Sequence, residues 1–508
     1  MKKYSDLEYL KLPKWKRLIY TIICVFCGIP SAVVNFFKNA FSAVVGAVKG
    51  VGNEIADIWF TFVNGDWKTR VSYLVMGFGS IARGQVLRGI LFLAMEIIFI
   101  VYMILWGVSW ISQLGTLGTL GPVTTFDPIL DVPMTTYNDN SFKILLYGVL
   151  SIFFIVGFIF TWRINIKQNK IAEQILATGK KLKSGKDDLR SMVDDNFHAT
   201  LLSLPLAGIL IFTVMPMVFM ILVAFTNYDS LHNGYTNNLF TWVGMENFNV
   251  MLGFGDGNAD YGIAFGEILS WTLMWAFFAT FTNYFMGMGV AMMINKKGIK
   301  LKKLWRSCLV MTVAVPQFIS LMYVSKMFAD NGIVNGFLNS LGFETFKFWG
   351  TAMSARIMVI ILNIWVGIPY LMLMVTGILM NIPADLYESA KIDGAGPWKQ
   401  FTKITLPYML FITGPYLLTS FTGNMNNFNV IYLLSGGGPA KTGISGVLAS
   451  PGHTDLLITW LFKMITTSEP AAYNLASVLG ILVFIVVAGI SLIVYNVMPS
   501  IKNEEDFQ

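Results

Sequence analysis

The sequence YESAKIDGAGPW, residues 387–398, is a short polar segment between two long apolar runs, and it continues to Ile-Thr-Leu-Pro at residues 404–407. Pro383 suits the start of a helix, where its missing N–H costs no hydrogen bond. Gly394 can take the left-handed conformation that ends such a helix, and Pro397 can begin the next one. The pattern predicts two short helices and a turn, placed between membrane spans.

The composition is that of a membrane protein. Hydrophobic residues make up 55% of the 508 residues and charged residues 13%, against roughly 25% charged in soluble domains. A spanning helix needs about 20 apolar residues, and lipid offers no partner for an exposed backbone N–H or C=O. The sequence therefore predicts an all-α polytopic membrane protein with about eight spans. The expected spans are residues 87–110, 142–162, 200–226, 268–294, 304–327, 355–380, 408–433 and 474–497.

The charges of the loops predict the orientation of the chain. Residues 112–141 and 227–263 contain acidic but no basic residues, whereas residues 163–190 and 296–306 are rich in Lys and Arg. Because basic loops stay in the cytoplasm, we expect both termini and the segment 387–398 on the cytoplasmic side. The net charge of +7 then reflects this orientation rather than binding to nucleic acid.

The first 86 residues are harder to assign. Residues 18–37 are apolar, but Gly28 and Pro30 interrupt them, and residues 41–63 mix apolar with charged positions. The second pattern is typical of an amphipathic helix on a membrane surface. We expect interfacial or re-entrant helices here, and an extra hairpin of spans is the alternative.

Two motifs resemble ligand sites but lack the residues that such sites need. Cys24 and Cys27 have the spacing of a redox or metal pair, without a second pair or a nearby His. The segment GGGPAKT, residues 436–442, resembles a phosphate-binding loop, but Ala440 stands where Gly must precede the Lys. We therefore expect no catalytic residue, no metal and no nucleotide cofactor in this chain.

Two predicted spans carry polar side chains on one face. Asn363 and Tyr370 are about two helical turns apart, and Gly367 between them leaves room beside the backbone. The second stripe follows i, i+4 and i+7: Ser420, Asn424 and Asn427. Polar groups in a bilayer need partners or a watery cavity. Neutral amides and hydroxyls beside aromatic rings suit a neutral sugar, and hydrogen bonds between helices are the alternative.

Glu96 is a lone carboxylate within the first span. Its burial costs about 2.5–3.5 kcal/mol or more, so we expect a structural partner or contact with cytoplasmic water. A proton-coupled carrier is the other class of protein that could use it. Such a carrier needs titratable residues inside the core spans, and the third, sixth, seventh and eighth spans have essentially none in their interiors.

The segment 383–407 resembles the EAA loop of ABC importer permeases, the loop through which these permeases contact their ATPase. The matching residues are Glu388, Ala390, Gly394, Ile404, Leu406 and Pro407. Residues from about 200 to 497 resemble the six-span core of type I importers, and most closely the larger permease subunit of the maltose and maltodextrin family. The family motif Asn-Ile-Trp-x-Gly-x-Pro-Tyr matches residues 363–370, and further motifs match residues 420–428 and 437–439.

The resemblance implies four regions along the chain. They are N-terminal cytoplasmic or interfacial helices (1–86), two accessory spans with a basic loop (87–199), the permease core with its coupling loop (200–497) and a cytoplasmic tail (498–508). Loop 227–263 is too short for the external domain that some members of the family carry at this point.

The resemblance also implies a sugar site, because the two matching span segments line such a site in the family. The implied sugar-binding residues are Asn363, Gly367, Tyr370, Ser420, Asn424 and Asn427. Gly423 and Val313 stand where the family has an aromatic residue and a tyrosine. Both departures remove stacking surface, so a wider pocket for a longer or different oligosaccharide is expected.

The function implied by the resemblance is that of a permease subunit of an ATP-driven importer, which moves malto-oligosaccharides across the bacterial plasma membrane. The implied partners are a second permease subunit, an ATPase homodimer that holds ATP and Mg, an extracellular sugar-binding lipoprotein, the oligosaccharide and membrane lipid. The alternatives are import of another oligosaccharide or polyol and, less in keeping with the sequence, a proton-coupled secondary carrier.

Overall fold

The structure, a computed structural model, describes residues 48–497 except 128–131, 183, 196, 297 and 445, together with residues 38, 42, 43, 45 and 46. The Cys24–Cys27 pair, the apolar run 18–37 and the tail 498–508 lie outside the described residues. The described residues form two compact units: the N-terminal unit within Phe36–Asn247, and the core unit from Phe248 onward.

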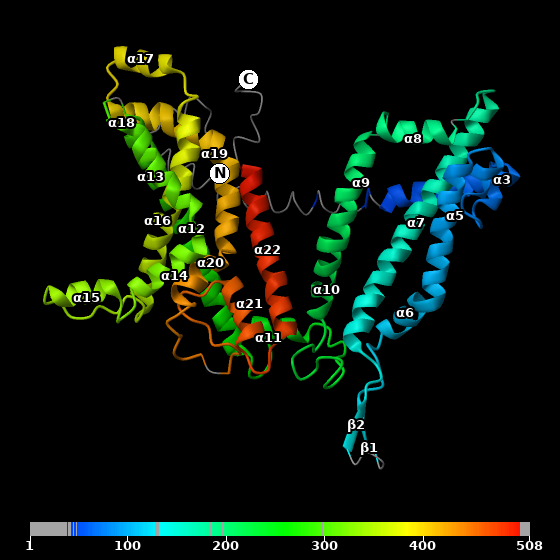
Figure 1. Ribbon diagram of the computed structural model, residues 1–508, viewed down its shortest axis with the longest axis horizontal. Coiled ribbons are helices and arrows are strands. Elements are labelled where there is room, and N and C mark those ends of the chain that lie inside the picture. Colours follow the sequence, from blue (N-terminus) through cyan, green and yellow to red (C-terminus); the bar gives the residue numbers. More distant parts are fainter. Residues whose placement is uncertain are drawn as a thin grey trace, which may run out of the picture. The chain divides into compact units, whose positions relative to one another are not determined.

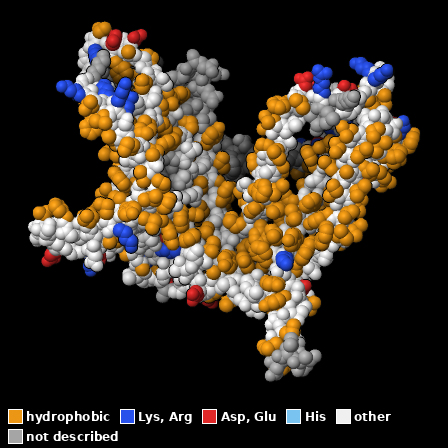
Figure 2. Space-filling view, viewed as in Figure 1, with side chains coloured by type: hydrophobic (Ala, Val, Ile, Leu, Met, Phe, Trp, Pro, Cys, Tyr) orange, Lys and Arg blue, Asp and Glu red, His pale blue; other side chains and the backbone are white. Residues whose placement is uncertain are grey.

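Long helices dominate both units (Figure 1). Among the described residues, seven helices are long and apolar enough to cross a membrane, or eight if one bent pair is counted as a span. The seven are Val86–Leu114 (α5, η1 and α6), Ser141–Ala177 (α7), Phe197–Val223 (α9, η2 and α10), Ala259–Asn295 (α12), Ala352–Leu379 (α16), Pro397–Met425 (α18, η3 and α19) and Tyr473–Tyr495 within α22 (Tyr473–Val497). Hydrophobic side chains cover the lengths of these helices (Figure 2). The predicted class, an all-α polytopic membrane protein with about eight spans, is confirmed.

The fifth predicted span, residues 304–327, is not one straight helix. It consists of α13 (Lys302–Ala314) and α14 (Gln317–Met327), which meet at an angle of 92°. The break falls at Val315, which is extended, and Pro316. Proline has no backbone N–H to donate and disfavours a helical conformation in the residue before it, so a helix ends here.

A buried arginine organises the first elements of the N-terminal unit. Residues 48–64 are helical, and α3 (Trp67–Val71) and α4 (Phe78–Ala82) follow. The Arg83 guanidinium donates to Asp66 Oδ1, Thr69 Oγ1 and Asn169 Oδ1, each at 2.6 Å. Because a buried cation needs such partners, these bonds hold α3 and α4 against α7.

The helix at residues 48–64 lies against α7 by its acidic side. Ion pairs join Glu54 to Arg163 and Asp57 to Lys170. The apolar side chains of this helix, such as Ile55 and Trp59, are exposed. This division into two faces is the one expected of an interfacial helix, and its position on a membrane surface stays a prediction.

Glu96 has a structural partner, in agreement with one of the two explanations expected for it. Its buried carboxylate accepts a hydrogen bond of 2.8 Å from the backbone N–H of Met76. The turn that precedes α4 is thereby joined to α5 (Val86–Tyr102). Glu96 therefore contributes to packing within the N-terminal unit.

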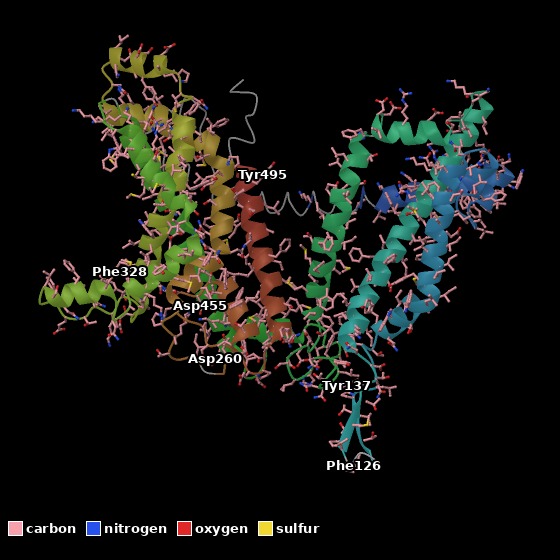
Figure 3. The ribbon with its side chains drawn as sticks, in the orientation of Figure 1. Phe126, Tyr137, Asp260, Phe328, Asp455 and Tyr495 are labelled. Carbon is pink, nitrogen blue, oxygen red and sulfur yellow. The ribbon has the colours of Figure 1, made fainter. Side chains whose placement is uncertain are left out.

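The N-terminal unit also contains elements that the sequence did not predict. Strands β1 (Val123–Asp127) and β2 (Val132–Thr136) form an antiparallel hairpin, in which Val123 pairs with Thr136. Phe126 and Tyr137 mark the two ends of this hairpin (Figure 3). Helix α8 (Gly185–Val193) begins in a capping box formed by Ser184 and Asp187.

Helix α12 is the centre of packing in the core unit. Its Trp275 and Tyr284 are fully buried. Trp275 belongs to an apolar cluster with residues of α16 and α20, and Tyr284 belongs to a second cluster with residues of α16 and α19. The Trp275 indole donates to the backbone oxygen of Asn424 at 3.1 Å. The two segments with predicted polar stripes therefore pack on the same helix. The shorter helices of this region are α11 (Glu246–Leu252), α15 (Ile333–Ser340), α17 (Ala384–Ile392), α20 (Phe428–Ser435) and α21 (Leu457–Thr466).

The seventh span begins and ends at other residues than predicted. Helix α19 (Leu406–Met425) continues α18 (Pro397–Gln400) and η3 (Phe401–Thr405) without a gap, and it ends eight residues before the predicted end at 433. Asn427 caps the next helix, because its Oδ1 accepts from the backbone N–H of Val430 at 3.3 Å. Asparagine favours such caps over helix interiors. The expected continuous i, i+4, i+7 stripe is therefore wrong at Asn427.

Candidate functional site

The predicted coupling segment forms two helices with a glycine turn, as expected. Helix α17 covers Ala384–Ile392, and Gly394 follows it with a φ of +72°. A Cβ at Gly394 would meet no atom within 4 Å, so the left-handed backbone alone favours glycine at this position. The second helix begins at Pro397. One direct bond, from Tyr387 Oη to Thr405 Oγ1 at 2.9 Å, joins the two helices.

Three large apolar side chains of this segment are exposed among its charged residues. Ile392 is 88% exposed, Trp398 76% and Leu386 48%. Each is available for contact with another protein. Of the predicted coupling residues, Glu388, Gly394 and Pro407 are exposed, whereas Ala390, Ile404 and Leu406 are half-buried.

The residues predicted on α16 have different surroundings. Asn363 is 5% exposed, whereas Tyr370 is 54% exposed. Gly367 does not open a free space as expected, because a Cβ there would lie 2.5 Å from Nδ2 of Asn283 on α12. The small residue instead allows α12 and α16 to approach closely.

The residues predicted on α19 and after it form a short chain of hydrogen bonds. Asn424 Nδ2 donates to Thr280 Oγ1 of α12 at 3.0 Å, and Asn427 Nδ2 donates to Asn424 Oδ1 at 3.1 Å. Each amide has two N–H groups and two lone pairs, so these bonds leave capacity for further partners. Both alternatives stated for the stripe, helix–helix bonds and sugar contacts, therefore have a chemical basis here.

Aromatic rings connect the two predicted segments. The rings of Tyr370 on α16 and Tyr416 on α19 have their centroids 6.5 Å apart. The Tyr416 hydroxyl interacts with the side chain of Ser420. Tyr370 and Ser420, far apart in the sequence, are thus both neighbours of Tyr416.

A cavity of about 440 Å³ lies at the break between α13 and α14. Tyr370 and Trp365 of α16 line it, together with Val313 and Gln317 on either side of the break in sequence. Sequence reasoning singled out Val313 for its missing ring but overlooked the amide of Gln317. The Ala-Val-Pro sequence at residues 314–316 was the signal for this break, because a proline inside an apolar run interrupts a helix.

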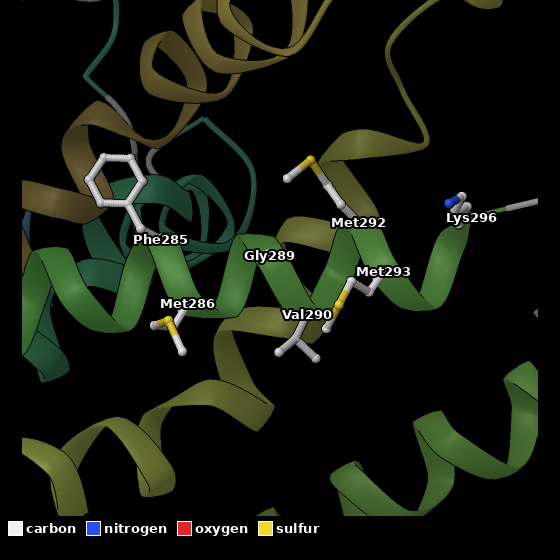
Figure 4. Close-up of a pocket in the computed structure, with 7 residues that line it drawn as sticks. All are labelled: Phe285, Met286, Gly289, Val290, Met292, Met293 and Lys296. Carbon is white, nitrogen blue, oxygen red and sulfur yellow. The ribbon is translucent and has the colours of Figure 1, made fainter. Parts of the chain in front are cut away.

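A second hollow, of about 480 Å³, lies on one side of α12 (Figure 4). Its lining is apolar except for one lysine, and a Cβ at Gly289 in this lining would meet no atom within 4 Å. The lining residues are Phe285, Met286, Gly289, Val290, Met292, Met293 and Lys296. This lining lacks the hydrogen-bonding groups that a sugar requires, and it suits lipid or an apolar helix.

The glycine-rich segment 436–442 forms a turn, as predicted, and its Gly437 lies against a carboxylate. Asp455, labelled in Figure 3, is fully buried, and a Cβ at Gly437 would overlap its side chain. Asp455 accepts from Lys463 Nζ at 2.7 Å and from the backbone N–H of Gly452 at 2.6 Å. A carboxylate this close to the segment disfavours a bound phosphate, because like charges repel.

Comparisons with known proteins agree with this architecture. The family described as "Binding-protein-dependent transport system inner membrane component" matches residues 283–502. The maltodextrin transport system permease protein MdxF of Bacillus subtilis is 33% identical over 446 residues, which are 85% of this chain and 95% of MdxF.

Two further relatives cover similar lengths. The maltodextrin transport system permease protein MalC of Streptococcus pneumoniae (strain TIGR4) is 30% identical over 86% of this chain and 97% of its own length. The galactooligosaccharides transport system permease protein GanP of Bacillus subtilis is 31% identical over 85% of this chain and 97% of its own length.

The candidate spans and the match to a family of transport-system membrane components define a multi-pass membrane protein of the permease class. Relatives of this identity, matched over nearly their whole length, share their fold and their general role. The chain belongs to the family of ABC transporter permeases that includes the maltodextrin permeases MdxF and MalC.

Proposed function

We propose that this chain is a permease subunit of an ATP-driven importer, and that it moves maltodextrin-like oligosaccharides into the cytoplasm. The observation that carries the proposal is the match to MdxF over 95% of that protein's length. A further relative transports galactooligosaccharides by name and is nearly as similar. Import of another oligosaccharide is therefore the second candidate, and both candidates are neutral, hydroxyl-rich substrates.

The proposed substrate site lies where α12, α16 and α19 meet. The six implied residues supply three amides, one hydroxyl and one phenol, and the glycine allows two backbones to approach closely. They are Asn363, Gly367, Tyr370, Ser420, Asn424 and Asn427. The exposed rings of Tyr370 and Trp365 support the proposal, because aromatic rings pack against the apolar faces of sugars while amides bond the hydroxyls.

Coupling to a separate ATPase homodimer is proposed for α17 and the following turn. Glu388, Ala390 and Gly394 belong to the part that would contact the ATPase, and exposed Ile392 and Trp398 offer apolar contact area. Ile404, Leu406 and Pro407 continue into α19. A movement of α17 would therefore reach α19 and its polar residues through one continuous helix.

The remaining proposed partners follow from the permease class. A second permease subunit would complete the transport path, and the apolar hollow that includes Gly289 suits close packing of a partner helix. An extracellular sugar-binding lipoprotein would deliver the oligosaccharide. Both termini are proposed to lie in the cytoplasm of a bacterial cell, as the basic loops indicate. ATP and Mg would be held by the ATPase, and this chain itself would carry no cofactor.

The proposal is tested by uptake of labelled oligosaccharides into cells of the source organism. Deletion of this chain should abolish ATP-dependent uptake of maltotriose and longer maltodextrins, and the intact chain supplied from a plasmid should restore it. Uptake of galactotetraose is measured in parallel to separate the two candidate substrates. Unchanged uptake of both sugars after deletion would overturn the proposal, as would stoichiometric ATP binding by the purified chain.

A further inference from the structure

Two buried amides between α12 and α16 have unused hydrogen-bonding atoms. Asn283 of α12 is 8% exposed and Asn363 of α16 is 5% exposed. Among the described residues, neither Asn283 Oδ1 nor Asn363 Nδ2 has a hydrogen-bond partner. A buried polar group without a partner destabilises a protein, and most such groups in folded proteins are bonded. Two on facing helices require an explanation.

The two amides lie in the same part of the helix interface. Gly367 is one turn after Asn363 on α16, and a Cβ at Gly367 would lie within 2.8 Å of three atoms of the Asn283 amide. Asn283 is also one turn after Thr280, whose hydroxyl accepts from Asn424. Helix α12 thus presents two polar residues in succession, one toward α19 and one toward α16.

The unused atoms are chemically complementary to a hydroxyl group. A carbonyl oxygen accepts a hydrogen bond and an amide N–H donates one, whereas a hydroxyl does both. We propose that Asn283 is a substrate-contacting residue, which together with Asn363 binds one hydroxyl of the transported oligosaccharide when α12 and α16 separate during transport. This inference rests on the proposed function and adds α12 as a third wall of the substrate site.

A purely structural role makes a different prediction about transport. If Asn283 only fills space, leucine of similar size should serve equally well, because it removes a buried group that lacks a partner. Asn283→Leu should then keep or raise the melting temperature and leave transport unchanged. For a substrate contact, the same variant should keep its stability but lose affinity for the sugar.

The experiment measures maltotriose uptake against concentration in cells that carry Asn283→Leu or Asn283→Ala as the sole copy of this chain. We expect the half-saturating concentration to rise about 2- to 10-fold, the range for one neutral hydrogen bond, with unchanged amounts of chain in the membrane. Thr282→Val is the matched control on α12, because the Thr282 hydroxyl bonds its own helix at Phe278 O. It should leave uptake unchanged.

If both Asn283 variants have the same half-saturating concentration for maltotriose as the unaltered chain, the inference is overturned. The proposed function would still stand as long as the unaltered chain imports maltotriose. A fall in uptake that merely follows a loss of chain from the membrane in both variants would also overturn it. If the unaltered chain imports no oligosaccharide, the proposed function itself fails.

Discussion

Asn424 of α19 donates from Nδ2 to Oγ1 of Thr280 on α12 at 3.0 Å, across 144 residues of sequence. The same asparagine accepts from Trp275 of α12 through its backbone oxygen. The end of α19 is therefore joined to α12 by a backbone and a side-chain bond. Any movement of α19 during transport must either break these bonds or carry α12 with it.

The Asn424–Thr280 bond is expected to contribute to stability. Thr280→Val should lower the free energy of unfolding by about 0.5–1.5 kcal/mol. Asn424→Ala should lower it further, because it also removes the bond from Asn427. The double variant should lose less than the sum, because both changes remove the Asn424–Thr280 bond. Denaturant unfolding of the purified chain in detergent measures all three. Strict additivity would show that the two side chains do not interact.

Gly394 is expected to be essential for coupling but not for insertion into the membrane. Gly394→Val forces a β-branched residue into a φ of +72°, at a cost of about 1–2 kcal/mol, so the turn after α17 should change. We expect sugar uptake and stimulation of the ATPase to fall while the chain reaches the membrane in normal amount. Gly394→Asn is the control, since asparagine tolerates the left-handed region.

The result that contradicts this role is normal uptake and normal ATPase stimulation by Gly394→Val. Loss of the chain from the membrane would equally contradict it, because a Cβ at this position meets no atom within 4 Å and should not disturb the fold. Immunoblots of membrane fractions supply this measurement.

His453 is expected to make the core unit less stable in acid. It lies in the loop between α20 and α21, where burial lowers the pKa of His453 and the nearby charges of Arg356 and Lys441 lower it further. The unfolded chain, with a histidine pKa of about 6.5, therefore binds the proton more readily than the folded chain. The contribution of neutral His453 to the free energy of unfolding is therefore complete above about pH 6.5, and it is lost as the pH falls below this value and through the lower pKa of the folded chain.

The measurement is the melting temperature of the purified chain between about pH 8 and pH 5, the range in which a histidine titrates. The fall on the acid side should be smaller in His453→Gln than in the unaltered chain. His198→Gln is the control, because His198 is an exposed residue of α9. Identical pH profiles for all three chains would exclude this role for His453.

Local sequence signals predicted much of the fold. Apolar runs located the spans, because burial in lipid requires a minimum length of apolar helix. The sequence around Gly394 predicted the end of α17, because a left-handed turn favours glycine. The break within the fifth span at Pro316 and the end of the seventh span before Asn427 were missed, because a proline break and a helix cap override hydropathy.

The candidate site was only partly predictable. Residue spacing located polar positions on α16 and α19, but it could not reveal that Asn363 is buried or that Tyr370 borders a cavity. Polar residues in the fourth predicted span, such as Thr280 and Asn283, were a signal that sequence reasoning did not use. Only the tertiary structure showed that Thr280 bonds α19 and that Asn283 lies against α16.

The sequence by itself determined the class of protein, the approximate positions of the spans and the turn at Gly394, because each depends on residues close together along the chain. Tertiary structure decided which side of α12 faces α16 and α19, and therefore that Thr280 bonds Asn424 while Asn283 abuts Gly367. The physical reason is that a span's hydropathy fixes its place in the membrane but not its rotation. Rotation is set by packing and hydrogen bonds with helices that lie far away in the sequence.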